Sequence, residues 1–138
     1  MADRDSKSAH VTIGCNGATA VAMLTEAARR FGDDRRLAPA QAARLAILVE
    51  ELVINALEHG GVADDQRIDL TLADENGGLI MTLSDPGTPY DPRSHVRPDT
   101  VPERGGGAGL DLVLQWAEIL DYRRIGERNE LRLRLRHG

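Results

Sequence analysis

Residues 39–61 read PAQAARLAILVEELVINALEHGG, and they set what the rest of the chain must pack against. Apolar residues recur at helical spacing around most of the circumference, which predicts one long and largely buried helix over residues 39–59. Pro39 suits the first turn of a helix, and the two glycines at positions 60 and 61 are typical of a helix end. One narrow polar stripe interrupts this apolar surface, and it consists of Arg44, Glu51, Asn55 and Glu58, with His59 at its edge.

The segments around this helix predict a small α+β domain. Alternation of apolar and polar residues predicts four strands, at residues 10–15, 67–73, 79–84 and 131–135, of which the middle two form a hairpin. Two further helices are expected, over residues 18–31 with Gly32 as the stop, and from residue 110 to about residues 120–122. The order β-α-α-β-β-loop-α-β predicts a two-layer α/β sandwich with the helices on one face of the sheet.

Composition narrows the class of protein. The chain has 138 residues, of which 41% are hydrophobic and 28% charged, as in a globular protein with one domain over residues 1–138. A net charge of −5 argues against a nucleic-acid binder, and a single cysteine rules out an intrachain disulfide. Residues 1–8 form a charged N-terminus that we expect to be disordered. Without a secretory signal or an apolar run of about 20 residues, we expect a cytoplasmic protein.

Two residues of the polar stripe form a candidate site. Glu51 and Asn55 are four positions apart, so both side chains project from the same side of the helix. An amide oxygen can ligate Mg²⁺ while a neighbouring carboxylate accepts a proton. The alternative interpretation is a narrow solvent-exposed strip that happens to contain these residue types.

Two other motifs lie in the long, proline- and glycine-rich segment from residue 85 to residue 109. Asp85 ends an apolar strand, and Pro86 holds it extended, so that its carboxylate is a fixed acceptor for a group such as the adenine amine. Residues 105–110 read GGGAGL and open a helix, where backbone N–H groups can contact phosphate. The alternatives are an ordinary Asp-Pro-Gly turn and a flexible glycine linker.

Together the three motifs resemble those of the GHKL superfamily of ATPases and kinases. Residues 51–60, ELVINALEHG, resemble the N box, residues 85–92, DPGTPYDP, the G1 box, and residues 107–110, GAGL, the G2 box. The aromatic-Asp-Pro ending of the G1 box is similar to that of anti-sigma-factor serine/threonine kinases. This resemblance implies a Bergerat-type ATP-binding fold with a mixed, mostly antiparallel sheet, and an ATP lid over residues 86–109.

The resemblance also implies a role for each matching position, with ATP and Mg²⁺ as the bound groups. Asn55 would ligate the Mg²⁺, Glu51 would be the general base, and His59 would approach the phosphates. Asp85 would accept the adenine amine, and Gly87 would leave room for the ring. Four lid positions would surround the phosphates, namely Gly105, Gly107, Gly109 and Leu110.

Function and partners follow from the same resemblance. Sensor histidine kinases typically carry Asn at the position of Glu51, and the short chain is also typical of anti-sigma kinases. The resemblance therefore implies a kinase that phosphorylates a STAS-type anti-anti-sigma protein and sequesters a sigma factor. It also implies a homodimer. The alternatives are a nucleotide-gated binding switch without kinase activity and the ATPase component of a multicomponent signalling system. One departure from the family is that residues 128–130 read RNE where a Gly-Thr pair usually supports the adenine-binding Asp. Asn129 retains hydrogen-bonding capacity there.

Overall fold

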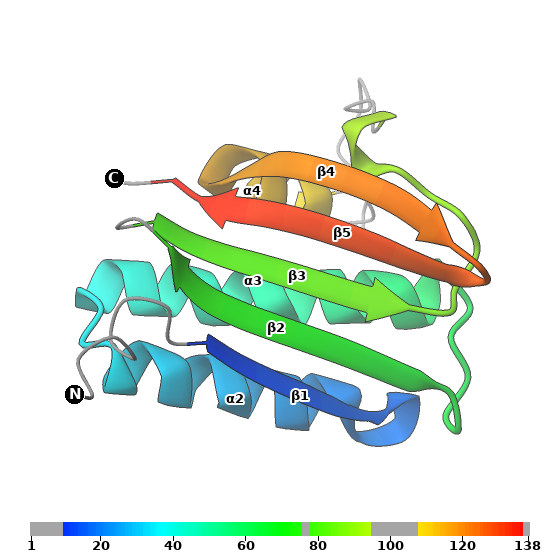
Figure 1. Cartoon of the computed structure of the whole chain (residues 1–138), viewed down its shortest axis with the longest axis horizontal. Helices are drawn as coiled ribbons and strands as arrows, with labels where there is room; N and C mark the ends of the chain where they lie inside the picture. The colour runs from blue at the N-terminus through cyan, green and yellow to red at the C-terminus, as the bar shows by residue number, and fades with distance from the viewer. Residues whose placement is uncertain (1–9, 76–77, 95–107, 137–138) are drawn as a thin grey trace.

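The computed structural model describes residues 10–75, 78–94 and 108–136, and these form one two-layer domain (Figure 1). The elements, in chain order, are β1 (His10–Asn16), α2 (Gly17–Asp34), α3 (Pro39–Glu58), β2 (Arg67–Glu75), β3 (Gly78–Asp85), the 3₁₀ turn η1 (Pro92–Ser94), α4 (Ala108–Trp116), β4 (Ala117–Ile125) and β5 (Arg128–Leu135). Residues 1–8, which we expected to be disordered, and residues 95–107 of the expected lid lie outside the described residues.

The strands form one sheet in the order β1-β2-β3-β5-β4. Every pairing in this sheet is antiparallel, so the sheet is not mixed, contrary to expectation. Strand β5 lies between β3 and β4 and pairs with both. All three helices cover the same face of the sheet, with α3 behind the central strands (Figure 1). The predicted two-layer α/β sandwich is confirmed.

The core lies between the helices and the covered face of the sheet. Its largest fully buried side chains come from every layer, namely Leu24, Leu45, Leu48, Val49, Val53, Ile68, Leu70, Leu72, Val113 and Leu133. Burial of each such side chain stabilises the fold by roughly 1.5–3 kcal/mol. The helix predicted over residues 39–59 therefore lies at the centre of the core, and its polar stripe is the side that does not pack into the core.

Strand β5 shows the predicted alternation most clearly. Leu131, Leu133 and Leu135 are buried against the helices, while the arginines between them lie on the open face. Arg132 pairs with Glu75 at 3.7 Å and Arg134 with Glu118 at 3.8 Å, so this face is ionic and solvated.

Two sequence-based predictions about the elements are wrong. The last helix ends at Trp116 and not near residues 120–122, because residues 117–125 form the edge strand β4. A tight turn with Gly126 at φ 61° then leads back into β5. The helix over residues 18–31 also continues through Gly32 to Asp34, and a Cβ on Gly32 would lie 3.3 Å from that of Ala42. Gly32 thus permits close packing of α2 on α3, and it does not stop the helix.

Within the described residues, none of the helices combines the length and the apolar character needed to cross a membrane.

Candidate functional site

A cleft of about 370 Å³ opens where α3, β3 and the β4–β5 hairpin end together. Its polar lining includes Asn55 from α3, His59 directly after α3, Asp85 from β3, and Tyr90, Tyr122 and Asn129. Three leucines, Leu52, Leu83 and Leu131, supply apolar wall. Small-molecule sites typically combine such walls with a few placed polar groups, in volumes of roughly 300–1,000 Å³.

Asp85 is the buried acceptor of this cleft, with only 8% of its surface exposed. Its Oδ1 accepts hydrogen bonds from the N–H of Gly87, at 2.8 Å, and from Nδ2 of Asn129, at 3.1 Å. Both bonds use the same oxygen, so Oδ2 is left for a group in the cleft. A carboxylate held this rigidly suits a neutral donor in a fixed position, such as an exocyclic amine.

Gly87 lies where two parts of the chain approach closely. A Cβ at this position would lie 2.9 Å from both Oδ1 of Asp85 and the carbonyl oxygen of Gly60. The next residue, Thr88, donates its backbone N–H to the same Gly60 carbonyl at 2.9 Å. The segment after β3 is therefore fastened to the end of α3, and a side chain at position 87 would separate them.

The polar stripe of α3 continues from this cleft toward α4. Asn55 and His59, which are four residues apart, both line the cleft. Glu51 lies one turn further back and is not among the lining residues. Its carboxylate lies against Gly109 at the start of α4, where a Cβ would overlap Oε1 of Glu51. The structure thus brings Asn55, His59 and Asp85 together and places Glu51 beside them.

The glycine-rich motif is described only in part. Gly105 and Gly107 lie outside the described residues, whereas Gly109 and Leu110 belong to the first turn of α4. The side chain of Leu110 also lies outside the description. Gly109 is the member whose role the structure explains, because the absence of a Cβ lets the carboxylate of Glu51 reach the helix terminus.

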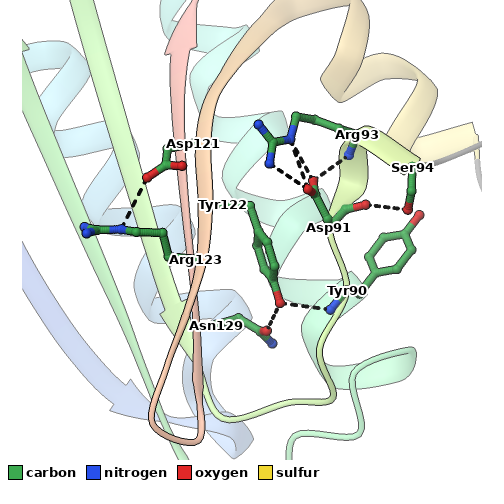
Figure 2. Close-up of polar contacts among 8 residues, drawn as sticks. All are labelled: Tyr90, Asp91, Arg93, Ser94, Asp121, Tyr122, Arg123 and Asn129. Atoms are coloured by element: carbon green, nitrogen blue, oxygen red, sulfur yellow. Dashed lines mark hydrogen bonds and ion pairs between the residues drawn. The ribbon is translucent and has the colours of Figure 1, made fainter.

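Sequence reasoning missed the contribution of β4. The hydroxyl of Tyr122 accepts a hydrogen bond from the backbone N–H of Tyr90, at 3.2 Å, and donates one to Oδ1 of Asn129 (Figure 2). Arg124 donates to the same Oδ1 at 3.1 Å and to the carbonyl of Gly87 at 2.7 Å. The signal that would have revealed this strand is Gly126, since a glycine followed by one residue is a common two-residue hairpin loop.

The segment after β3, which lines the cleft, ends in a compact charged turn. Asp91 accepts hydrogen bonds from the guanidinium of Arg93, at 2.7 and 3.0 Å, and from its backbone N–H, at 2.9 Å (Figure 2). Arg93 thereby lowers the pKa of the Asp91 carboxyl. Burial raises the pKa of the Tyr90 hydroxyl, with a smaller contribution from Asp91. Asp91 therefore stays ionised and Tyr90 neutral near neutral pH.

The residues present fit a purine nucleotide with a magnesium ion. The fixed carboxylate of Asp85 and the leucine walls suit the base, and Asn55 offers an amide oxygen of the type that Mg²⁺ accepts. In the described part of the chain, no three His, Cys, Asp or Glu side chains gather into a metal site. A magnesium ion beside Asn55 would thus need further oxygens from a bound phosphate, which is how protein sites usually hold it.

Comparison with known proteins agrees with this geometry. Residues 16–135 match the family model of the histidine kinase-like ATPase domain. No curated protein gives a significant match. The matched range extends from the end of β1 to the end of β5 and includes every residue that lines the cleft. The chain therefore belongs to the histidine kinase-like ATPase domains, the GHKL type of fold.

Proposed function

We propose that this domain binds ATP with Mg²⁺ in the cleft and transfers the terminal phosphoryl group to a serine or threonine of a partner protein. The observation that carries the proposal is that the buried acceptor Asp85 and the amide of Asn55 open into one cleft. Their chemistry matches the two ends of the ligand, because Asp85 suits the adenine amine and Asn55 suits the metal bound to the phosphates.

Each residue of the site has a defined task in this reaction. Asp85 accepts a hydrogen bond from the amine of adenine, and Gly87, which has no side chain, leaves room for the ring. Asn55 would hold the Mg²⁺ that neutralises charge on the phosphates. Glu51 accepts the proton of the attacking serine or threonine hydroxyl while the oxygen of that hydroxyl bonds to the γ-phosphorus. The bond from that phosphorus to the bridging oxygen breaks, and ADP leaves.

The partners are part of the proposal and rest on the family resemblance. We infer that the phosphorylated protein is a STAS-type anti-anti-sigma factor, and that the domain binds a sigma factor when this partner is absent or modified. Tyr90, Asp91 and Pro92 support the assignment, since they follow Asp85 in the order that anti-sigma kinases show. Tyr90, which is exposed, and Pro92, which is buried, both line the cleft. Such partners and ATP would place the protein in the cytoplasm.

Dimerisation is a further part of the proposal. Strand β1 is an edge of the sheet, and a groove of about 740 Å³ runs between it and α2, with the exposed side chains of Val11 and Met23 in its lining. Unpaired strand edges beside apolar surface favour association. We expect light scattering at tens of micromolar to give twice the monomer mass of 15.0 kDa. A monomeric mass with ATP bound would contradict the dimer.

One observation favours a second candidate, a nucleotide-gated binding switch or signalling ATPase that transfers no phosphoryl group to a protein. Glu51 does not line the cleft, and its carboxylate contacts the start of α4. If Glu51 serves only to hold α4, nucleotide binding would change the surface of the domain without phosphotransfer.

Substitutions on α3 separate the two functions. General-base catalysis contributes about 10²–10⁴-fold, so Glu51→Ala should lose that much phosphotransfer and keep its affinity for Mg-ATP within a few-fold. Asn55→Ala should weaken Mg-ATP binding itself. The assay is radiolabelled Mg-ATP added to the protein and an extract of its own cell, with calorimetry for affinity.

Glu50→Ala is the matched control, because Glu50 lies about 100° around the helix from Glu51. Loss of transfer in the Glu51 variant alone supports the kinase. Intact ATP binding by the wild type without transfer to any protein supports the switch. Equal loss in both glutamate variants contradicts the role given to Glu51.

A further inference from the structure

Asn129 lies at the centre of a hydrogen-bond network that reaches beyond the support of Asp85. Its Nδ2 donates to Oδ1 of Asp85 and also to two backbone carbonyls, those of Gly87 at 3.2 Å and Thr88 at 3.0 Å. Its Oδ1 accepts from Tyr122 and Arg124. Asn129 is only 7% exposed, so water cannot replace these partners freely.

The polarity of the network fixes the orientation of this amide. Every group facing Nδ2 is an acceptor, and both groups facing Oδ1 are donors. Rotation of the amide by half a turn would oppose Oδ1 to three acceptors on one side and Nδ2 to the guanidinium donor of Arg124 on the other. A single hydroxyl, as in the threonine usual in the family, has one proton and could not make the same set of bonds.

Tyr122 extends this network to residues 88–90, which line the cleft. Its hydroxyl joins the backbone N–H of Tyr90 to Oδ1 of Asn129 (Figure 2). Because Nδ2 of Asn129 donates to Asp85, the bonds run without interruption from Tyr90 to Asp85. Two neighbouring strands supply the anchors, since Tyr122 is on β4 and Asn129 on β5. The antiparallel pairing of Asp85 with Asn129 sets the register that brings them together.

We propose that Tyr122 and Asn129 are positioning residues that couple the carboxylate of Asp85 to residues 88–90, so that adenine selectivity and the geometry of this segment depend on the same hydrogen bonds. The selectivity half rests on the proposed function, in which Asp85 accepts the adenine amine. The anchoring half concerns the protein alone. It holds whichever nucleotide binds.

The test uses Tyr122→Phe and Asn129→Asp in the full chain. Tyr122→Phe removes one hydroxyl, and amide exchange at Tyr90 should become about two- to tenfold faster, the effect of one hydrogen bond. Asn129→Asp is isosteric and turns a carboxylate toward three acceptors. The dissociation constant of this variant for Mg-ATP should rise by about tenfold or more, since a buried charged group without partners is more destabilising than a neutral one.

Selectivity is read as the ratio of dissociation constants for Mg-ATP and Mg-inosine triphosphate, which lacks the exocyclic amine. Both variants should lower the preference for ATP, and their effects should be less than additive because they act on one network. Asn16→Asp is the matched control for added charge, since Asn16 is exposed at the end of β1. It should change neither the preference nor the exchange at Tyr90.

The outcomes separate this proposal from the proposed function. Lower melting temperatures with an unchanged preference for ATP and unchanged exchange at Tyr90 would overturn the coupling, while ATP binding would stand. A wild-type protein that binds neither nucleotide would overturn the proposed function and the selectivity half together. In that case the exchange at Tyr90 in Tyr122→Phe still decides the anchoring half.

Discussion

Asp85 is both a ligand-binding group and a structural acceptor, and the two roles can be separated by experiment. Asp85→Ala should abolish the preference for ATP over inosine triphosphate, because no acceptor remains for the amine. The variant should still unfold cooperatively, with a stability lower by about 1–3 kcal/mol, since the N–H of Gly87 and the amide of Asn129 lose their partner. Calorimetry and thermal melting measure the two effects. A retained preference for ATP would contradict the role of Asp85.

Much of the candidate site could be predicted from the sequence because its residues occur in short local motifs. Asn55, His59 and Asp85 all line one cleft, since the helical stripe and the strand end determine the directions of their side chains. The contribution of Tyr122 could not be predicted in the same way. It depends on a strand pairing across the sheet, and the hydroxyl meets Tyr90 and Asn129 only after the strands have assembled.

At the scale of elements, β4 shows why the sequence-based prediction of the fold was incomplete. The apolar residues after Trp116 continue the helical spacing of α4, so helix and strand are both compatible with them. As an edge strand, β4 is half-buried along its middle and exposed over its last residues, and it shows no clear alternation. Strand β5 is central and buried on one face, and its alternation of leucine and arginine was unmistakable. Burial on one face, and not strand formation itself, produced the readable pattern.

Strand β5 therefore offers a direct test of where stability resides. Leu133 is fully buried between β3 and β4, and Leu133→Ala should lower the free energy of unfolding by about 2–5 kcal/mol. The neighbouring Arg132→Ala is the control, because its pair with Glu75 is exposed and worth at most about 1 kcal/mol. Urea unfolding measures both. Comparable losses would mean that the open face contributes more than its exposure implies.

At the scale of the whole molecule, the single cysteine reports on unfolding. Cys15 lies in the core with 7% of its surface exposed, and burial raises the pKa of its thiol. Alkylation requires the thiolate, so at pH 8 the native protein should react far more slowly than the unfolded chain.

Nucleotide binding should slow this reaction further. A ligand at 100 times its dissociation constant stabilises the native state by about 2.7 kcal/mol, which is roughly a 100-fold slower reaction if Cys15 reacts through global unfolding. Pulsed alkylation followed by mass spectrometry, with and without Mg-ATP, measures the rate. An unchanged rate would show that the edge strand β1 opens locally, independently of the cleft.

The register of the sheet also determines how the domain can be handled in the laboratory. His10, Ala73, Ile80 and Arg134 form one row across four strands, so β1 begins and β5 ends at the same end of the sheet. Asp85, the last residue of β3, pairs with Asn129 at the other end of the sheet, and both line the cleft. A fusion tag or a biotin attached beyond either terminal strand would therefore fasten the protein to a sensor chip with the cleft facing the flowing solution.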